Sequence, residues 1–146
     1  MKQLLIVVII GLVISGCTSE TENTDQPQVM QNDPLAIDTV ETVSGKFVSY
    51  AHNLQGSASL LLKEDHSAIL RFENFTLLAG PDVHVLLSKS NNYSSSNVIE
   101  IASLKTGYTS SNLNFPLDGV NYTDDYKFVL VYCVEFNSLF GYTELK

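Results

Sequence analysis

Apolar and polar residues alternate with a period of two through most of the chain from Ser44 onward. Residues 57–63 place alanine or leucine at every second position, and residues 68–73 place alanine, leucine and phenylalanine in the same way after the polar segment 64–67. A period of two puts successive side chains on opposite faces of a strand. Two such runs around a short polar turn predict a β-hairpin.

Residues 126–133 are apolar on both alternating faces, which is typical of a strand in the middle of a sheet that is covered on both sides. No segment carries the apolar stripe of an amphipathic helix. Phe140 and Leu145 are expected to close the core around Gly141. The other expected strands are residues 47–51, 82–88, 98–104 and 113–117. About eight short strands with regular turn signals predict an all-β fold, an antiparallel β-sandwich formed by residues 44–146.

A separate apolar run, Leu4–Ile14, follows a start that carries one positive charge. As a helix it would span about 16 Å, which suits a signal peptide and is too short for a transmembrane helix. The run ends in small residues before Cys17, and this arrangement resembles the signal of bacterial lipoproteins. The resemblance implies that residues 1–16 are a signal peptide and that Cys17 is the lipidation site. An ordinary signal peptide with a coincidental cysteine is the alternative.

The segment 17–43 is predicted to be a disordered acidic tether. It holds six acidic residues, no basic residue and two prolines, so it cannot bury enough apolar surface to fold alone. Lipidation implies a protein of the bacterial cell envelope that is anchored in a membrane. Thr18 stands where, in Gram-negative lipoproteins, an aspartate favours retention at the inner membrane. The outer membrane is therefore the expected location if the organism has one.

The charge balance argues against nucleic acid as a partner. Sixteen acidic residues against eight basic ones give a net charge of −8, with no Lys/Arg cluster to meet phosphates. The tether carries six of these acids, so the acidity belongs mostly to the tether. Asp118, Asp124 and Asp125 flank a turn, but their spacing is not that of a calcium loop. A solvated turn is the favoured interpretation of these three, and the domain is expected to be a monomer.

Signatures of hydrolases and transferases are absent from the sequence. It has no Gly-x-Ser-x-Gly, no His-Glu-x-x-His and no glycine-rich phosphate loop. Its two cysteines cannot form a disulfide framework or a four-cysteine zinc site, and no metal site is predicted. If Cys17 is lipidated, Cys133 is the remaining thiol. Cys133 is interpreted either as a small buried hydrophobe or as a redox thiol or soft ligand to a prosthetic group.

Two histidines are candidate partners of Cys133. His84 shares a predicted strand face with Asp82, and His52 lies where a strand gives way to a polar segment. Either could act as a second ligand or as a proton partner, but sequence spacing cannot show that the three side chains meet. His66 lies in the predicted hairpin turn and is expected to be solvated.

Several motifs follow one another in a characteristic order. They are Gly45-x-Phe47, His52-x₃-Gly56, Leu70-x-Phe72-x-Asn74-Phe75, Gly80-Pro81-Asp82-x-His84-Val85 and Val131-Tyr132-Cys133-x₂-Phe136-x₃-Phe140-Gly141. Together they resemble the DM-thirteen domain, also called the electron-transfer DM domain, over about residues 44–146. Tyr132 departs from the tryptophan-type aromatic that many members carry before the cysteine.

This resemblance implies a β-sandwich and, among bacteria, a lipoprotein. It implies that Cys133 is a redox centre, either as a bare thiol or as a ligand to haem. The leading hypothesis is therefore a membrane-anchored envelope protein with a redox or electron-transfer role through Cys133, with His84 and His52 as partners. An envelope protein or redox protein would be its partner. The alternative is a binding or adhesion module in which Cys133 fills the core and the polar loop 91–97 serves recognition.

Overall fold

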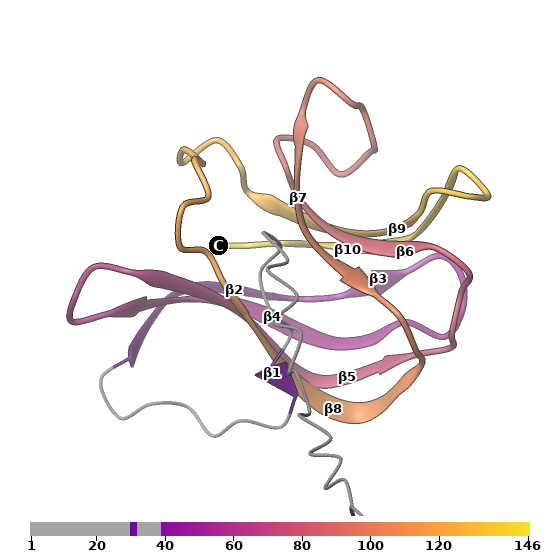
Figure 1. The fold of residues 1–146 in the computed structure, drawn as a ribbon, viewed down its shortest axis with the longest axis horizontal. Coiled ribbons are helices and arrows are strands. Elements are labelled where there is room, and N and C mark those ends of the chain that lie inside the picture. The colour runs from indigo at the N-terminus through magenta and orange to yellow at the C-terminus, as the bar shows by residue number, and fades with distance from the viewer. Residues whose placement is uncertain (1–29, 32–38) are drawn as a thin grey trace, which may run out of the picture.

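The computed structural model describes residues 30–31 and 39–146. Within these residues all regular structure is β-strand, and two antiparallel sheets pack face to face (Figure 1). The prediction of an all-β, antiparallel sandwich is confirmed. The predicted signal peptide 1–16 and Cys17 lie outside the described residues. No helix in the described part of the chain is long and apolar enough to cross a bilayer.

The two sheets contain five strands each. In the first sheet the order is β1 (Met30–Gln31), β8 (Tyr108–Pro116), β5 (Ala68–Leu77), β4 (Gln55–Lys63) and β2 (Thr39–Lys46). In the second sheet the order is β3 (Val48–Ser49), β10 (Ser138–Glu144), β9 (Phe128–Cys133), β6 (Val83–Ser88) and β7 (Val98–Leu104).

The predicted hairpin is present as β4 and β5. Leu60 lies opposite Leu70, and the turn is closed by a hydrogen bond from the Lys63 amide to the Ser67 carbonyl of 2.9 Å. His66 adopts a left-handed conformation in this turn, with φ of 66°, and is exposed, as expected for a turn residue. Short polar residues and a left-handed position allow the chain to reverse within four residues.

Four strand predictions need correction, one of them because the strand predicted at 113–117 begins at Tyr108 as β8. The first long strand begins at Thr39, inside the segment predicted as tether. The prediction missed this start because a register shift between Glu41 and Val43 breaks the alternation of apolar and polar residues there. The predicted strand 47–51 is reduced to β3, since the chain turns away after Ser49. The C-terminal strand β10 was not predicted as a strand, and only Phe140 and Leu145 were expected to close the core. A register shift at Phe140 hides the period of two in this strand.

The main core lies between the two sheets. Its largest fully buried side chains include Phe72, Phe75, Phe115 and Phe140, each 0% exposed. Phe47 packs edge-on against Phe72, with ring centroids 5.0 Å apart and an interplanar angle of 82°. Edge-to-face packing suits the charge distribution of aromatic rings, so this aromatic cluster helps to hold the layers together.

A second, smaller cluster covers the outer face of the β3-β10-β9-β6-β7 sheet. Leu86, Leu130 and Tyr132 are buried there, and the ring of Tyr93 from the loop 89–97 stacks on Tyr132 at 4.1 Å. The alternate residues of β9, including Cys133, face the main core. The prediction that this strand is apolar on both faces and central in its sheet is therefore confirmed.

The chain passes between the two sheets five times within residues 39–146. We call the end of the sandwich where β9 finishes the Cys133 end. Three of the crossings lie near that end, because the segments 50–54, 78–82 and 105–107 each join the two sheets there. The crossing from β2 to β3 lies along the sheet edge, next to the hydrogen bonds between Ser44 and Lys146. The other crossing, residues 117–127, lies at the opposite end (Figure 1).

Two glycines, Gly45 and Gly141, allow β2 and β3 to approach β10 closely. A Cβ atom on Gly141 would lie within 3.0 Å of the Val48 carbonyl oxygen and of the Leu54 side chain. A Cβ atom on Gly45 would meet the Glu144 carbonyl oxygen equally closely. Real Cβ atoms essentially never show such contacts. The missing side chains therefore permit β2 and β3 to lie against β10 where the chain changes sheet.

Thr143 supplies a stability prediction. Its hydroxyl is fully buried and has no hydrogen-bond partner among the described residues, and an unpaired buried polar group costs about 1–3 kcal/mol. Thr143→Val keeps the shape and removes that cost, so it should raise the free energy of unfolding by about 1 kcal/mol. Urea denaturation of the two proteins measures the difference. A Thr143→Val protein that is less stable than the parent would mean that the hydroxyl has a partner, such as a bound water.

Candidate functional site

Cys133 is the last residue of β9, and its side chain is 0% exposed in the core between the sheets. It is a free cysteine. Directly opposite it lie Val83 of β6 and Ser138 of β10. Val83 is fully buried and Ser138 is half-buried, so the β10 side is the less covered flank of the thiol. A reagent can reach this sulfur only when the Cys133 end of the sandwich loosens.

His84 lies on the other face of the same sheet. It pairs with Tyr132, whereas its neighbour Val83 pairs with Cys133, and adjacent residues of a strand point to opposite faces. The sheet therefore stands between the imidazole of His84 and the sulfur of Cys133. The structure does not bring these two predicted site residues together.

The ring of His84 is held by two carboxylates. Its Nδ1 lies 2.8 Å from Oε1 of Glu100, and its Nε2 lies 2.8 Å from Oδ1 of Asp82. Ionised carboxylates only accept hydrogen bonds, so both contacts form together when both ring nitrogens carry protons. The side chain of His84 is 14% exposed. This arrangement ties the start of β6 to β7 and leaves neither ring nitrogen open to a further ligand.

His52 lies at the Cys133 end. It has a left-handed backbone conformation, with φ of 58°, and its ring stacks on Phe140 with centroids 3.9 Å apart. The amide of Leu78 donates a hydrogen bond of 3.1 Å to the His52 carbonyl. The exposed ring of His52 thus covers the buried Phe140 from outside. Both predicted histidines thus lie near the Cys133 end, but His84 is on the other face of the sheet from the sulfur.

The same end exposes three apolar side chains that the sequence reasoning missed. Leu78 is 60% exposed, Val134 is 49% exposed and Phe136 is 63% exposed. We call these three residues the apolar rim. Their segments are linked through the loop 78–82, because the amide of Val134 donates to the Asp82 carbonyl at 2.9 Å. The sequence signal for this surface is the presence of two apolar residues, Val134 and Phe136, in the turn that follows Cys133. Three exposed apolar side chains near one end of the sandwich make that end a candidate contact surface.

Tyr132 connects this end to the outer cluster. Its hydroxyl donates a hydrogen bond to the side-chain oxygen of Asn137, and its ring stacks on Tyr93. Burial raises the pKa of the Tyr132 phenol above its usual value, and the neighbouring Tyr93 and Cys133 add to this increase. The phenol therefore stays protonated at neutral pH and acts as a hydrogen-bond donor.

A haem ligated by Cys133 does not fit the described residues. The sulfur is enclosed by core side chains, and His84 lies across the sheet with both ring nitrogens bound to carboxylates. His52 is occupied in stacking on Phe140. Among the residues that the structure describes, no three histidine, cysteine, aspartate or glutamate side chains are grouped to hold a metal ion.

The three aspartates of the acidic turn between β8 and β9 lie in different environments. Asp125 pairs with the Lys89 ammonium at 2.6 Å and also accepts a hydrogen bond from Thr123, and these contacts lower the pKa of its carboxyl group. Asp118 is exposed, and Asp124 lines a cavity at this end of the sandwich. The cavity lies at the start of β9, so it is remote from Cys133 along the full length of that strand.

Comparison with known proteins gives one match. The family described as electron transfer DM13 matches residues 46–145, which include Cys133, His84, His52 and the apolar rim. Searches of curated proteins and of solved structures found no matching protein. The family match covers nearly all of the described sandwich.

Proposed function

The chain belongs to the electron transfer DM13 family, and we propose that it is a membrane-anchored envelope protein whose sandwich takes part in thiol or electron transfer through Cys133. The match to the family over residues 46–145 carries this proposal. Cys133 is the group in this region whose sulfur can change oxidation state.

The position of Cys133 supports a guarded thiol. It immediately precedes the exposed turn 134–137, and the half-buried Ser138 flanks it in the neighbouring strand. Loosening of that turn would expose the sulfur without separating the two sheets. Two residues of the apolar rim, Val134 and Phe136, belong to this turn, so a partner protein that covers the rim would meet the turn directly. His52 serves as a cover over Phe140 in this proposal, and His84 has no part in the thiol chemistry.

The reaction is disulfide exchange with a partner. The Cys133 thiol loses its proton to solvent, and the thiolate attacks one sulfur of the partner's disulfide. The partner's sulfur–sulfur bond breaks, its second sulfur leaves as a thiolate, and a mixed disulfide forms. The Cys133 sulfur is thereby oxidised, and the partner disulfide is the oxidant.

Oxidised glutathione tests this proposal. In the full chain under native conditions, Cys133 should form a mixed disulfide slowly, about 100-fold slower than in denaturant, because the thiol must first be exposed. Peptide mapping by mass spectrometry distinguishes Cys133 from Cys17. His52→Ala should accelerate the reaction, since it uncovers Phe140, whereas His84→Ala, across the sheet, is the matched control and should leave the rate unchanged. Absence of any mixed disulfide until the protein unfolds would reject the proposal.

Complete burial of Cys133 favours a second candidate, a binding or adhesion module in which the cysteine fills the core. The contact surface would then be the apolar rim alone. Cys133→Ala separates the two candidates, because it removes a redox role entirely but leaves a binding surface intact. Partner capture that survives Cys133→Ala and is lost with Phe136→Ser would support the binding module.

We also propose lipid anchoring through Cys17, and the outer membrane as the destination if the bacterium has one, because Thr18 follows the cysteine. Both residues lie outside the described part of the chain. Fractionation of membranes on a sucrose gradient tests the destination, and recovery with the inner membrane would contradict it.

A further inference from the structure

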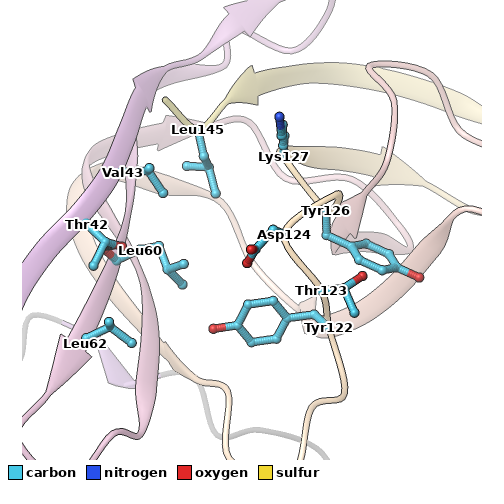
Figure 2. A pocket seen from close by; sticks show the side chains of 10 residues that line it. All are labelled: Thr42, Val43, Leu60, Leu62, Tyr122, Thr123, Asp124, Tyr126, Lys127 and Leu145. Atoms are coloured by element: carbon cyan, nitrogen blue, oxygen red, sulfur yellow. Dashed lines mark hydrogen bonds between the residues drawn. The ribbon is translucent and has the colours of Figure 1, made fainter.

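A cavity of about 390 Å³ opens between the two sheets at the end opposite Cys133. Figure 2 shows strand residues on one side and the acidic turn on the other. A volume of this size suits a small molecule. It is lined by Thr42, Val43, Leu60, Leu62, Tyr122, Thr123, Asp124, Tyr126, Lys127 and Leu145.

One wall of the cavity is apolar. Val43, Leu60 and Leu145 line it from three different strands or strand ends, and Leu62, which is 40% exposed, continues it towards solvent (Figure 2). A ligand that covers such a wall is stabilised, because apolar surface is removed from water. It therefore fits the carbon skeleton of a ligand and not a hydrated ion.

The facing wall carries a carboxylate. Figure 2 shows the carboxylate of Asp124 directed into the space between the leucines and the ring of Tyr122. Within the described residues, Asp124 has no hydrogen-bond or ion-pair partner, whereas the adjacent Asp125 is paired with Lys89. The amino group of Lys127 points away from Asp124 in the same view. Within the described residues, the Asp124 carboxylate thus has no ion-pair partner, although Lys127 also lines the cavity.

Tyr122 lies beside this carboxylate in the cavity wall. Burial raises the pKa of the Tyr122 phenol, and the charge of Asp124 raises it further. Tyr122 is therefore protonated and partly withdrawn from water at neutral pH. Asp124 itself is exposed, so a cation can reach its carboxylate from solvent, while the phenol and the apolar wall cover the rest of a ligand.

We propose that this cavity binds a small organic cation, namely an ammonium group carried on an apolar body. The ammonium would pair with Asp124, and the apolar body would cover the wall formed by Leu60 and Leu145. A metal ion fits less well, because the described residues offer it a single carboxylate here and no cluster of three ligands. This site is independent of the proposed function at Cys133, since it lies at the other end of β9.

Calorimetric titration of the full chain in detergent tests the proposal with three probes of one shape. They are 2-phenylethylammonium, the neutral 2-phenylethanol and the anionic 3-phenylpropanoate. The cation should bind at least about tenfold more tightly than the alcohol, and the anion should not bind. Asp124→Asn should remove the preference for the cation. Asp118→Asn is the matched control, because it makes the same change on the same turn outside the cavity.

The outcomes separate cleanly. Loss of cation binding in Asp124→Asn, with retention in Asp118→Asn, supports the site. Equal binding of all three probes, or cation binding that Asp124→Asn leaves unchanged, would overturn it, as would no binding at millimolar probe. Thermal unfolding of each variant checks that the fold is intact, and these results stand whatever the glutathione experiment at Cys133 shows.

Discussion

Alanine in place of Gly141 or Gly45 is expected to lower the free energy of unfolding by about 3 kcal/mol, with a fall in the melting temperature of about 10–20 °C. The added Cβ at Gly141 would press on the Val48 carbonyl oxygen, and at Gly45 it would press on the Glu144 carbonyl oxygen. Both obstacles are backbone atoms held in strand pairing, so neither can rotate aside. The strain must move β2 or β3 away from β10, at the point where the chain changes sheet.

Gly119→Ala is the control for these two substitutions. Gly119 has a positive φ of 76°, but an added Cβ would meet nothing within 4 Å. Only the left-handed backbone is then disfavoured, which costs about 1 kcal/mol. Thermal and urea denaturation of the three variants should therefore rank Gly119→Ala far closer to the parent protein. If all three substitutions cost the same, close packing at the edge strands would not be the reason for the glycines at positions 45 and 141.

Cys17→Ser should abolish lipid attachment completely. The predicted acyl groups are joined through the Cys17 sulfur, and serine offers no thiol for that linkage. Each buried methylene contributes about 0.8 kcal/mol, so several acyl chains hold a protein in a membrane almost permanently. Metabolic labelling with an alkyne fatty acid, followed by fluorescent coupling, measures the attachment directly. The labelled protein should also partition into the detergent phase.

Cys133→Ser is the matched control for this labelling, because it removes the chain's other cysteine. The Cys133→Ser protein should keep the full label, since the Cys133 sulfur of the parent protein is enclosed in the core and is not expected to carry a fatty acid. A label that survives Cys17→Ser would place the fatty acid elsewhere. A parent protein without any label, cleaved near residue 17, would instead indicate an ordinary signal peptide.

The sequence was sufficient for most of the fold, because burial repeats along each strand. In β9 the alternation assigns Val131 and Cys133 to one face and Tyr132 to the other, and the structure has them so. The hairpin of β4 and β5 was equally accessible, since its turn residues lie between two regular runs. The start of β2 and most of β10 escaped prediction because register shifts at Glu41–Val43 and Leu139–Gly141 interrupt the period of two.

The arrangement of the candidate site depends on information that no single strand carries. Whether His84 faces Cys133 depends on which residues pair between β6 and β9, and a shift of one residue would have put both on the same face. The stacking of His52 on Phe140 depends in the same way on a left-handed turn that meets a register shift. Residue types alone could suggest these histidines but could not place them.

The cavity was also beyond sequence reasoning. Asp124 was grouped with Asp118 and Asp125 as a solvated turn, because all three share one short acidic segment. Only the fold distinguishes them, by pairing Asp125 with Lys89 and directing Asp124 towards leucines from distant strands.

The uneven distribution of the connections between the sheets has a mechanical consequence. Within residues 39–146, three of the five crossings bind the layers together near Cys133, whereas residues 117–127 alone cross where β9 starts. We therefore expect thermal fluctuations that part the layers to be larger beside Asp124 than beside Cys133. Small solutes would enter more readily beside Asp124, whereas oxidants of the sulfur would approach the end where more connections join the sheets.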